Sequence, residues 1–440
     1  MANSRAFALV PLLPCALSCH AAVSYAAAPV PAKKDAFFGC LVKEIPARLL
    51  YAKSSPAFPT VLAQTIRNSR WSSPQNVQPL YIITPTNASH IQSAVVCGRR
   101  HAVRLRRPRL RGPIVPVRAP RGVRRRRPQQ DAGRVGRRQG SHGVGGLRGG
   151  GGESFGIVVS WQVNLLPVPP TVTVFQIPKT VREGAVELVN KWQLVGPALP
   201  DDLMIRIIAF GDTAKFEGMY LGTCKTLTPL MTSKFPELGM NASHCNEMPW
   251  IKSVPFIHLG KQATLFDLLN RNNTFKPFAE YKSDYVYQPV PKTVWAQIFV
   301  WLVKPGAGIM IMDPYGAAIS ATPEAATPFP HRKGVLFNIQ YVNYWFDEAG
   351  GAAPLQWSKD MYRFMEPYVS KNPRQAYANY RDIDLGRNEV VNDVSTYASG
   401  KVWGEKYFKG NFQRLAITKG KVDPQDYFRN EQSIPPLLAK

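Results

Sequence analysis

Apolar runs, several of which alternate with polar positions, predict a series of strands through the middle of the chain. β-branched and aromatic residues at every second position, or in short unbroken runs, are typical of strands. The run at residues 156–163, Gly-Ile-Val-Val-Ser-Trp-Gln-Val, is strongly β-branched. The predicted strands are residues 79–83, 156–163, 171–177, 203–210, 214–221, 308–312 and 335–344.

Helical spacing of apolar residues fills several of the intervals. It predicts helices over residues 181–193, 294–302, 358–368 and 412–419. Nearer the N-terminus, Asn87 is placed to cap a helix over residues 89–98, which follows one strand and precedes a further apolar run at 102–105. This order begins a βαβ unit, and the later strands with interleaved helices predict an α+β fold with antiparallel pairing.

The segment at residues 102–148 shows neither the alternation of a strand nor the apolar spacing of a helix. In it 37 of 47 residues are Arg, Gly, Pro, Ala or Val, and no Phe, Tyr or Trp occurs between residue 102 and Phe155. Such a composition buries too little apolar surface to offset the entropy of ordering the chain. We therefore predict that residues 104–147 are disordered.

The same segment explains the basic character of the protein. The formal charge is +26, but 17 arginines and one acid, Asp131, between Arg99 and Arg148 supply 16 of these charges. Nucleic-acid binding would be the first interpretation of so basic a chain. The segment has no interleaved aromatic residues for base stacking, so we predict no specific nucleic-acid partner.

The first 28 residues are typical of a secretory signal peptide. Arg5 supplies the basic start, residues 6–17 the short apolar core, and residues 24–28 the small side chains suited to cleavage. No later stretch reaches the roughly 18 uninterrupted apolar residues of a membrane span. We expect secretion to the extracellular space or the cell wall, and no membrane-spanning segment.

Cysteine usage agrees with secretion. After removal of the signal peptide four cysteines remain, Cys40, Cys97, Cys224 and Cys245, and an even number in an oxidising compartment favours disulfides. The histidines are scattered, and His244 beside Cys245 is better explained as structural, so we predict no metal site. Glycosylation sequons occur at three asparagines, Asn87, Asn241 and Asn272.

Two short segments offer candidate chemistry. Residues 152–156 match the Gly-x-Ser-x-Gly pattern of hydrolases, but the nucleophile needs a strand before it and a helix after it, whereas here a glycine run precedes and a predicted strand follows. The glycines at 149–152 could approach a phosphate or a flavin closely, or form a flexible turn. The second segment, residues 377–386, could bind a sugar or a flavin edge, or be a polar strand end.

Longer stretches resemble a known family. Residues 38–41, 68–71, 79–104 and 148 to the C-terminus are similar to the plant berberine-bridge-enzyme-like FAD-linked oxidoreductases, and among them to the group 4 grass-pollen allergens. The most diagnostic stretches are Phe-Pro-Glu-Leu-Gly-Met at 235–240, Lys-Ser-Asp-Tyr-Val at 282–286, residues 379–386 and residues 427–436.

The resemblance implies a two-domain architecture. A vanillyl-alcohol-oxidase-type FAD-binding domain would include residues 29–103 and 148–170, and a substrate domain with an antiparallel sheet covered by helices would follow at 171–370. Residues 371–440 would return to the FAD domain. Members of the family oxidise alkaloids, alcohols or carbohydrates by passing a hydride to FAD, so a small-molecule substrate is expected. No oligomeric state is indicated.

The resemblance also implies roles for particular residues. Cys40 and Cys97 match the disulfide partners of the family, and Asn338 and Gln340, alternate residues of one strand, should line the substrate pocket, unless both amides only satisfy neighbouring backbone. Many relatives have an ionisable residue in place of Asn338, and because an amide takes no proton at neutral pH, we expect a phenol, Tyr377 or Tyr380, to act as base. The expected FAD contacts are Gly150, Gly151, Gly156, Ile157, Val158 and Asn411.

The chain departs from the family after residue 106. The flavin-linking Ser-Gly-Gly-His-Asp-Tyr motif, a second flavin attachment and the pyrophosphate loop are absent, and His101 and His142 lie in other contexts. Permitted codons for residues 123–132, shifted by one base, can encode Phe-Ala-Val-Val-Asp-Leu-Ser-Lys-Met, a plausible strand of the flavin domain. We therefore predict a frame-shifted, incomplete FAD domain and impaired oxidoreductase activity. The alternative is a non-catalytic, allergen-like secreted glycoprotein or a defective gene-model product.

Overall fold

The computed structural model of the chain describes residues 31–66, 68–72, 79–101, 149–160, 163–269 and 275–438. Three predictions lie outside these residues: the signal peptide at 1–28, the disordered segment at 104–147 and the sequon at Asn272. The apolar run at 102–105, which would complete the βαβ unit, also lies outside them.

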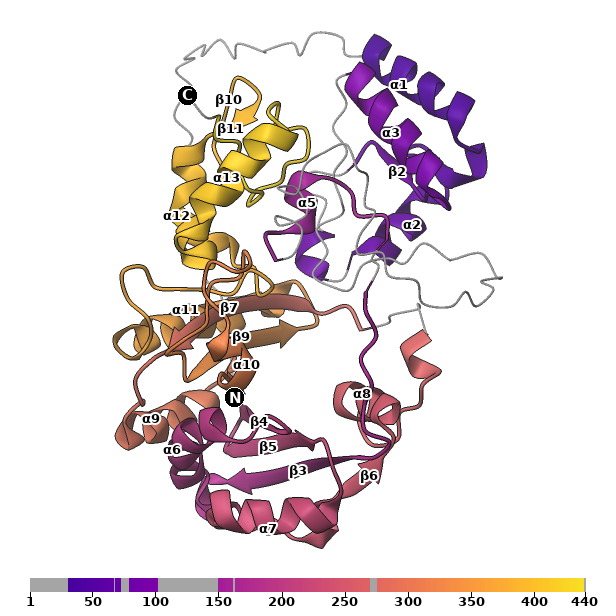
Figure 1. The fold of residues 1–440 in the computed structure, drawn as a ribbon. Helices are drawn as coiled ribbons and strands as arrows, with labels where there is room; N and C mark the ends of the chain where they lie inside the picture. Colours follow the sequence, from indigo (N-terminus) through magenta and orange to yellow (C-terminus); the bar gives the residue numbers. More distant parts are fainter. Residues whose placement is uncertain are drawn as a thin grey trace, which may run out of the picture.

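A seven-stranded sheet forms the centre of the described structure (Figure 1). Its strands are ordered β6-β3-β5-β4-β8-β9-β7, and every neighbouring pair is antiparallel, which confirms the predicted pairing. The strands are β3 (Val172–Thr180), β4 (Leu203–Phe210), β5 (Thr213–Tyr220), β6 (Asn246–Met248), β7 (Phe278–Val286), β8 (Ile309–Pro314) and β9 (Phe337–Trp345).

The hairpin of β4 and β5 shows how the sequence specifies these strands. Along β4 the buried residues Leu203, Ile205 and Ile207 alternate with more exposed ones, which is the period of a strand with one face in the core. Gly211, with φ +54°, allows the tight turn between the two strands. The register then pairs Leu203 with Tyr220 and so aligns the buried positions of both strands.

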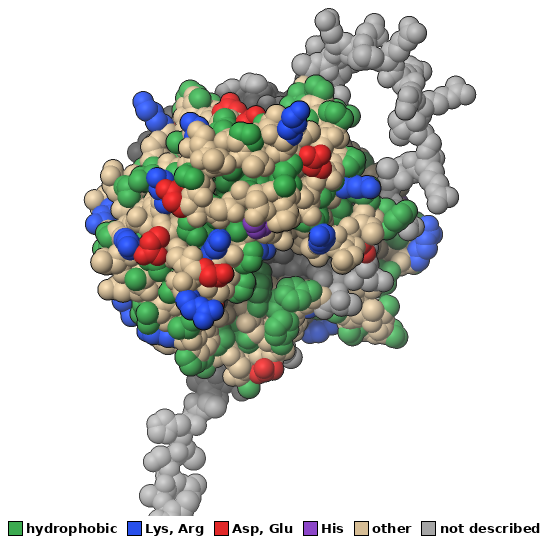
Figure 2. All heavy atoms as spheres, turned by 90° about the horizontal axis from the view of Figure 1, so that it is seen from below, with side chains coloured by type: hydrophobic (Ala, Val, Ile, Leu, Met, Phe, Trp, Pro, Cys, Tyr) green, Lys and Arg blue, Asp and Glu red, His purple; other side chains and the backbone are tan. Residues whose placement is uncertain are grey.

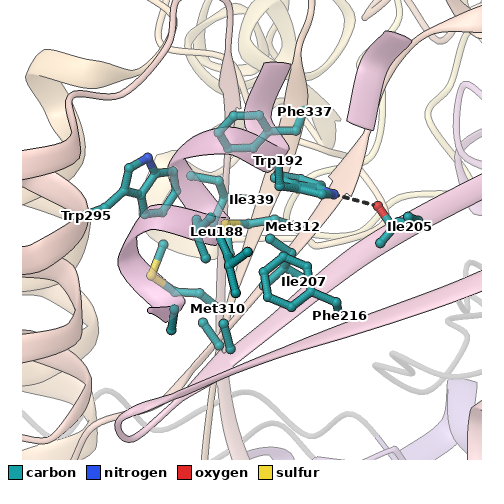
Figure 3. Close-up of a cluster of buried hydrophobic side chains, with 14 of the residues drawn as sticks. Leu188, Trp192, Ile205, Ile207, Phe216, Trp295, Met310, Met312, Phe337 and Ile339 are labelled. Carbon is teal, nitrogen blue, oxygen red and sulfur yellow. Dashed lines mark hydrogen bonds between the residues drawn. The ribbon is translucent and has the colours of Figure 1, made fainter. Parts of the chain in front are cut away.

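Helices cover one face of the sheet. α6 (Ala185–Val195), α7 (Cys224–Lys234), α9 (Lys292–Leu302) and α11 (Ala352–Met365) contribute to a hydrophobic core drawn from residues 175–369. Figure 3 shows Trp192 of α6 in this core, where its Nε1 donates a hydrogen bond of 2.8 Å to the carbonyl of Ile205. A buried indole N–H needs such an acceptor, so this bond fixes the orientation of α6 on the sheet.

An N-terminal unit is stabilised by a disulfide. α1 (Pro31–Glu44) packs on α3 (Ala88–Arg100), and Cys40 and Cys97 form a disulfide between them, as the family resemblance implied. The side chain of Asn87 accepts a hydrogen bond from the amide of His90 and caps α3, as predicted. The remaining elements here are β1 (Leu50–Ala52), paired with β2 (Tyr81–Ile83), and α2 (Phe58–Thr65).

The C-terminal segment packs against the glycine segment at 149–156. α12 (Tyr397–Phe408) and α13 (Asn411–Val422) enclose a second core, and Phe155 of α5 (Gly152–Phe155) lies against it. The buried ammonium of Lys419 donates to the Ser154 carbonyl at 2.6 Å. Figure 1 shows α5 between this C-terminal segment and α2. The smaller elements are α8 (Trp250–Leu259), α10 (Ala317–Ala321), β10 (Val390–Val391) and β11 (Val394–Ser395).

The strand predicted at residues 156–163 is wrong over its described part. Residues 156–160 and 163 form no strand, because no neighbouring strand of the described chain lies beside them to complete a hydrogen-bonded ladder. Conversely, β7 was not predicted. Its sequence, Phe-Ala-Glu-Tyr-Lys-Ser-Asp-Tyr-Val, includes a lysine, a serine and an aspartate that are all buried. A second disulfide joins Cys224 to Cys245, a pairing that the sequence left open.

The surface of the described residues has mixed charge on the face seen from below. Figure 2 shows basic and acidic side chains interspersed with apolar ones there, so no patch of one sign dominates that face. Within the described ranges, no helix is long and apolar enough to cross a membrane.

Candidate functional site

The second face of the sheet is polar, and it holds both predicted substrate residues. Met312 and Ile339 belong to the helix-covered core. Since side chains alternate between faces along a strand, Asp313 of β8 and Asn338 and Gln340 of β9 point to the other side. The register supports this placement, because Asp313 is the partner of Asn338.

The loop that carries the two predicted catalytic phenols is anchored to the same face. Ser283 of β7 is the strand partner of Gln340, and its hydroxyl accepts a hydrogen bond of 2.8 Å from the amide of Tyr377. The rings of Tyr377 and Tyr380 meet edge to face with centroids 4.9 Å apart. The structure therefore brings segments about 40 residues apart in the sequence, around Gln340 and Tyr377, onto one face of the sheet.

Both phenols are held in their protonated form. Burial raises the pKa of Tyr377, and burial together with the charge of Asp313 raises the pKa of Tyr380. The amide of Asn379 donates to the Tyr377 hydroxyl at 2.7 Å. At neutral pH these phenols are hydrogen-bond donors, so a role as base would require an additional group that lowers their pKa.

Asp313 is a candidate residue that the sequence did not reveal. Its carboxylate is half-buried, and burial raises its pKa although Arg206 acts in the opposite direction. Among the described residues its side chain has no hydrogen-bond or ion-pair partner. Its charge raises the pKa of Tyr315 as well as of Tyr380, so it lies among phenols. In the sequence it is one acid in a short apolar strand, and only the register shows its neighbours.

Arg206 is already paired with another carboxylate. Its Nε lies 2.8 Å from Oε1 of Glu217, which is buried and also accepts from Gln176. Lys215 adds a second cation at 3.4 Å. Glu217 is therefore fully partnered within the sheet, in contrast to Asp313.

The side-chain oxygen of Asn338 also lacks a partner among the described residues. Its side chain is 2% exposed, and its Oδ1 has no hydrogen-bond partner in the described structure. Buried amide oxygens are normally hydrogen-bonded, because leaving one unpaired costs free energy. The alternative that the Asn338 amide only satisfies neighbouring backbone is therefore not supported for this oxygen.

A buried histidine packs against β7 on this face of the sheet. The His331 ring stacks on Tyr285, the strand partner of Asn338, with centroids 3.9 Å apart. Its Nε2 donates to the Tyr407 carbonyl at 3.0 Å, and its Nδ1 lies 2.9 Å from the Gln375 amide. Burial lowers the pKa of His331 to about 4, so the ring is neutral at pH 7.

The glycine segment is occupied by contacts with the protein itself. Ser154 is 2% exposed, and its hydroxyl accepts from the amide of Ile434 at 3.0 Å, which excludes it as an accessible nucleophile. Glu153 pairs with Arg381. Gly150 is buried, Gly151 and Gly156 have positive φ, and Ile157 and Val158 are partly buried.

Asn411, a predicted cofactor contact, lies at the start of α13. Its Nδ2 donates to the carbonyls of Glu324, Thr327 and Pro328 at 2.8 to 3.3 Å, and its Oδ1 accepts from Arg414. Its amide thus holds the loop at 324–328. A role of Asn411 toward FAD stays a prediction.

Three acids come close together at the edge of the sheet. The carboxylates of Glu280, Asp382 and Asp384 lie within 4.8 Å of one another. The Lys282 ammonium stands between them, 3.0 Å from Asp382 and 2.8 Å from Asp384. This cation balances the acids, and the geometry is that of an ion-pair network.

Two of the predicted glycosylation sequons fall on exposed positions, Asn87 and Asn241.

Comparisons with known proteins decide the family. The model of the berberine and berberine-like family matches residues 376–435. The berberine bridge enzyme-like protein Cyn d 4 of Cynodon dactylon is 54% identical over 528 aligned positions that cover both chains completely. This chain belongs to the berberine bridge enzyme-like family. Since it has 440 residues, Cyn d 4 has at least 88 residues with no counterpart here.

Solved structures agree with this assignment. Phl p 4, described as a grass pollen allergen with glucose dehydrogenase activity, is 61% identical and superimposes with a TM-score of 0.84, covering 92% of this chain and 100% of Phl p 4. The structure of berberine bridge enzyme-like 28 of Arabidopsis thaliana is 31% identical, with a TM-score of 0.81 over 92% of this chain and all of that one.

More distant relatives match only in part. The tetrahydroberberine oxidase of Berberis wilsoniae is 44% identical over 308 residues, which are 67% of this chain and 58% of that protein. The alignment thus spans a little over half of that relative. The predicted family and the α+β fold with an antiparallel sheet are confirmed, and the relatives include oxidoreductases that act on small molecules.

Proposed function

We propose that the polar face of the sheet is the substrate surface of a secreted oxidoreductase of FAD-linked lineage, in which the part that would hold the flavin is impaired. The observation that carries the proposal is the convergence of Asn338, Gln340, Tyr377 and Tyr380 on one face of β7, β8 and β9. Polar groups that converge at one place on a scaffold are typical of small-molecule sites.

The groups on this face suit a substrate that carries hydroxyl groups. The phenols of Tyr377 and Tyr380 are protonated donors, and the Gln340 amide can donate and accept. Alcohols and carbohydrates match this mixture, and both belong to the substrate range of the family. The glucose dehydrogenase activity of Phl p 4 is in line with a sugar.

The contacts around the expected flavin site support impairment. Glu153 in the glycine segment is paired with Arg381, so the guanidinium of Arg381 is already used by the protein. The buried ammonium of Lys419 is used by Ser154, Asp423 and Asp426, and the Asn411 amide by three carbonyls. We infer that the described residues do not supply a complete FAD site, and we place the residues missing relative to Cyn d 4 in the flavin domain.

Flavin content tests this proposal directly. Purified chain, incubated with excess FAD and desalted, should retain far less than one flavin per chain, measured by visible absorbance against protein concentration. The matched control is the same chain with the family's flavin segment restored in frame between residues 103 and 148, which should retain about one. Nearly one flavin per chain in the unaltered protein would refute impairment. Sequencing the transcript across codons 100–150 shows which version the gene encodes.

The second candidate is a non-catalytic secreted glycoprotein. It is favoured by the large core at residues 175–369, which is complete without any contribution from a flavin. Under this alternative, secreted protein should carry N-glycans at Asn87 and Asn241, both exposed, and Asn87→Gln or Asn241→Gln should each remove one glycan by mass. The two candidates separate when the frame-restored version is assayed for alcohol or sugar oxidation.

A further inference from the structure

A cavity of about 520 Å³ lies beyond the edge strand of the central sheet. β7 is that edge strand, and β9 is bonded to only one of its sides. Along the other side runs the loop that follows α11, where the Ser370 amide donates to the Tyr285 carbonyl at 2.8 Å. The cavity is lined by this loop at residues 367–371, by residues 287–289 after β7, and by Gln375.

The lining has a buried base and an exposed mouth. Gln375 and Val369 are 7% and 6% exposed, the rings of Tyr287 and Tyr368 are half-buried, and Lys371 is exposed. A cavity of this volume, with aromatic and apolar walls and a few polar groups, has the usual make-up of a small-molecule site. The two phenol rings offer flat apolar surface against which another ring can pack.

The hydrogen bonds at the base determine which groups are left for a ligand. One atom of the Gln375 side-chain amide lies 2.9 Å from Nδ1 of His331 and 2.8 Å from the Tyr287 hydroxyl. The His331 ring is neutral, and its one hydrogen, on Nε2, is donated to the Tyr407 carbonyl. Since Nδ1 can therefore only accept, the Gln375 atom that faces it is the amide nitrogen, which donates to Nδ1 and to the Tyr287 oxygen.

This assignment leaves one acceptor and one donor unused at the base. The carbonyl oxygen of the Gln375 side chain then has no partner among the described residues, and neither has the hydroxyl hydrogen of Tyr287. Burial raises the pKa of Tyr287, so that hydrogen is present at neutral pH. A ligand hydroxyl both donates and accepts and can satisfy the two groups together, whereas a carboxylate only accepts and an ammonium group only donates.

The mouth of the cavity favours an anion. Of the described residues that line it, only Lys371 carries a charge. Lys371 forms no ion pair with another described residue, so its ammonium is free to pair with a negatively charged ligand group. Because Lys371 is exposed, such a pair contributes modestly to affinity and weakens as salt is added.

We propose that this cavity is a binding site for a small phenolic carboxylate. The phenol hydroxyl of the ligand donates to the Gln375 carbonyl oxygen and accepts from the Tyr287 hydroxyl. Its ring packs against Tyr287 and Tyr368, and its carboxylate points toward Lys371. The site is independent of the proposed function, because none of its lining residues belongs to the predicted substrate or flavin contacts.

The experiment measures binding of 4-hydroxycinnamate to the purified full chain at neutral pH, by calorimetry and by saturation-transfer NMR. Cinnamate, which lacks the phenol hydroxyl, should bind about fivefold more weakly, as expected for one lost hydrogen bond. The methyl ester of 4-hydroxycinnamate, which lacks the charge, should bind about threefold more weakly, as expected for one exposed ion pair.

Two variants assign these losses to residues. Lys371→Gln should weaken binding of the acid about threefold and leave binding of the methyl ester unchanged. Tyr287→Phe, which keeps the ring, should weaken binding of 4-hydroxycinnamate about fivefold and leave binding of cinnamate unchanged. Lys261→Gln, at an exposed lysine outside the cavity, is the matched control and should bind as the wild type does.

Three results would overturn the inference. They are no binding of 4-hydroxycinnamate by a wild type that unfolds cooperatively, unchanged affinity for it in both Lys371→Gln and Tyr287→Phe, or its displacement by glucose, which would place it on the substrate face. Since Lys371 is exposed, Lys371→Gln tests the site even if Tyr287→Phe fails to fold. Flavin content of the chain bears on the proposed function alone.

Discussion

The two faces of the central sheet are built from the same strands but carry different side chains, mainly apolar on one face and mainly polar on the other. Phe216 and Glu217 are neighbours in β5, yet Phe216 packs in the helix-covered core and Glu217 forms an ion pair on the other side. On β9, Ile339 lies in the core between Asn338 and Gln340. The covered face is stabilised mainly by apolar packing, whereas the polar face contains both groups with partners and groups that lack partners among the described residues.

This difference teaches where stability and function are encoded. Side chains on the covered face contribute through apolar burial, which is roughly proportional to area and needs no exact partner. On the polar face each group contributes only if a specific partner is present. Among the described residues neither Asp313 nor the Oδ1 of Asn338 has one, so substitutions there should affect binding more than folding. The predictions below test this contrast, from the largest expected effect to the smallest.

The largest effect is expected at the centre of the covered face. Trp192→Ala removes a fully buried indole and its hydrogen bond to Ile205, and should lower the free energy of unfolding by about 4 kcal/mol, measured by urea denaturation. Phe346→Ala, at a ring that is 72% exposed, is the control and should change it by less than about 0.5 kcal/mol. Equal effects of both variants would mean that the core assignment is wrong.

The second effect depends on pH and concerns His331. Since burial lowers its pKa from 6.5 to about 4, the unfolded chain binds a proton before the folded chain does as the pH falls. The contribution of His331 to the free energy of unfolding, taken as the difference between wild type and His331→Phe, should therefore be largest above about pH 6.5 and decrease toward pH 4, by up to about 1.4 kcal/mol per pH unit. His331→Phe should remove this slope, and His258→Gln, at an exposed histidine, should keep it. Parallel profiles for wild type and His331→Phe would contradict the assignment.

A smaller effect is expected for the satisfied pair on the polar face. Arg206→Met leaves the buried Glu217 carboxylate without its guanidinium partner, and should cost about 2 kcal/mol at pH 7 in the same denaturation assay. Lys215 remains nearby and limits the loss. The double variant Arg206→Met with Glu217→Met should recover part of the stability. A double variant less stable than the single one would show that the pair is not an isolated unit.

The smallest effect on stability is expected at the unpartnered position. Asn338→Leu replaces a buried amide whose oxygen has no partner with an apolar side chain of similar size, and should change the free energy of unfolding by less than about 1 kcal/mol. Since Asn338 lies on the proposed substrate face, substrate binding by the same variant should nevertheless weaken. A loss of 2 kcal/mol or more would show that the Asn338 amide stabilises the fold and would remove the contrast between the two faces.

Local pattern was sufficient for much of the fold. The strand at 203–210 was predicted with its exact bounds. Apolar residues at every second position all lie on the same face of a strand, so only one orientation of the strand buries them together. The cap at Asn87 followed from a side chain that can accept the free amide hydrogens at the start of a helix. The family resemblance correctly supplied the pairing of Cys40 with Cys97.

The sequence-based predictions failed in two places. One strand was predicted where no neighbouring strand is found, and one was missed because its buried charges have partners far away in the sequence. Residues 156–160 include β-branched side chains, but no strand of the described residues lies beside them, and they form none. β7 escaped notice because Lys282 and Asp284 are acceptable inside the structure only through Asp382, Asp384 and Arg374, about 90 to 102 residues further along.

By itself the sequence determined the family, the alternation that places side chains on one face or the other, and the disulfide-bearing character of the chain. Only the tertiary structure decided which polar residues share a face and which of them have partners. Asp313 and Glu217 are both single acids within strands, and nothing in their neighbours distinguishes them. Arg206 lies on the strand next to Glu217 and neutralises it, and no cation of the described residues forms an ion pair with Asp313. Electrostatic balance depends on distance in space, and sequence separation does not encode that distance.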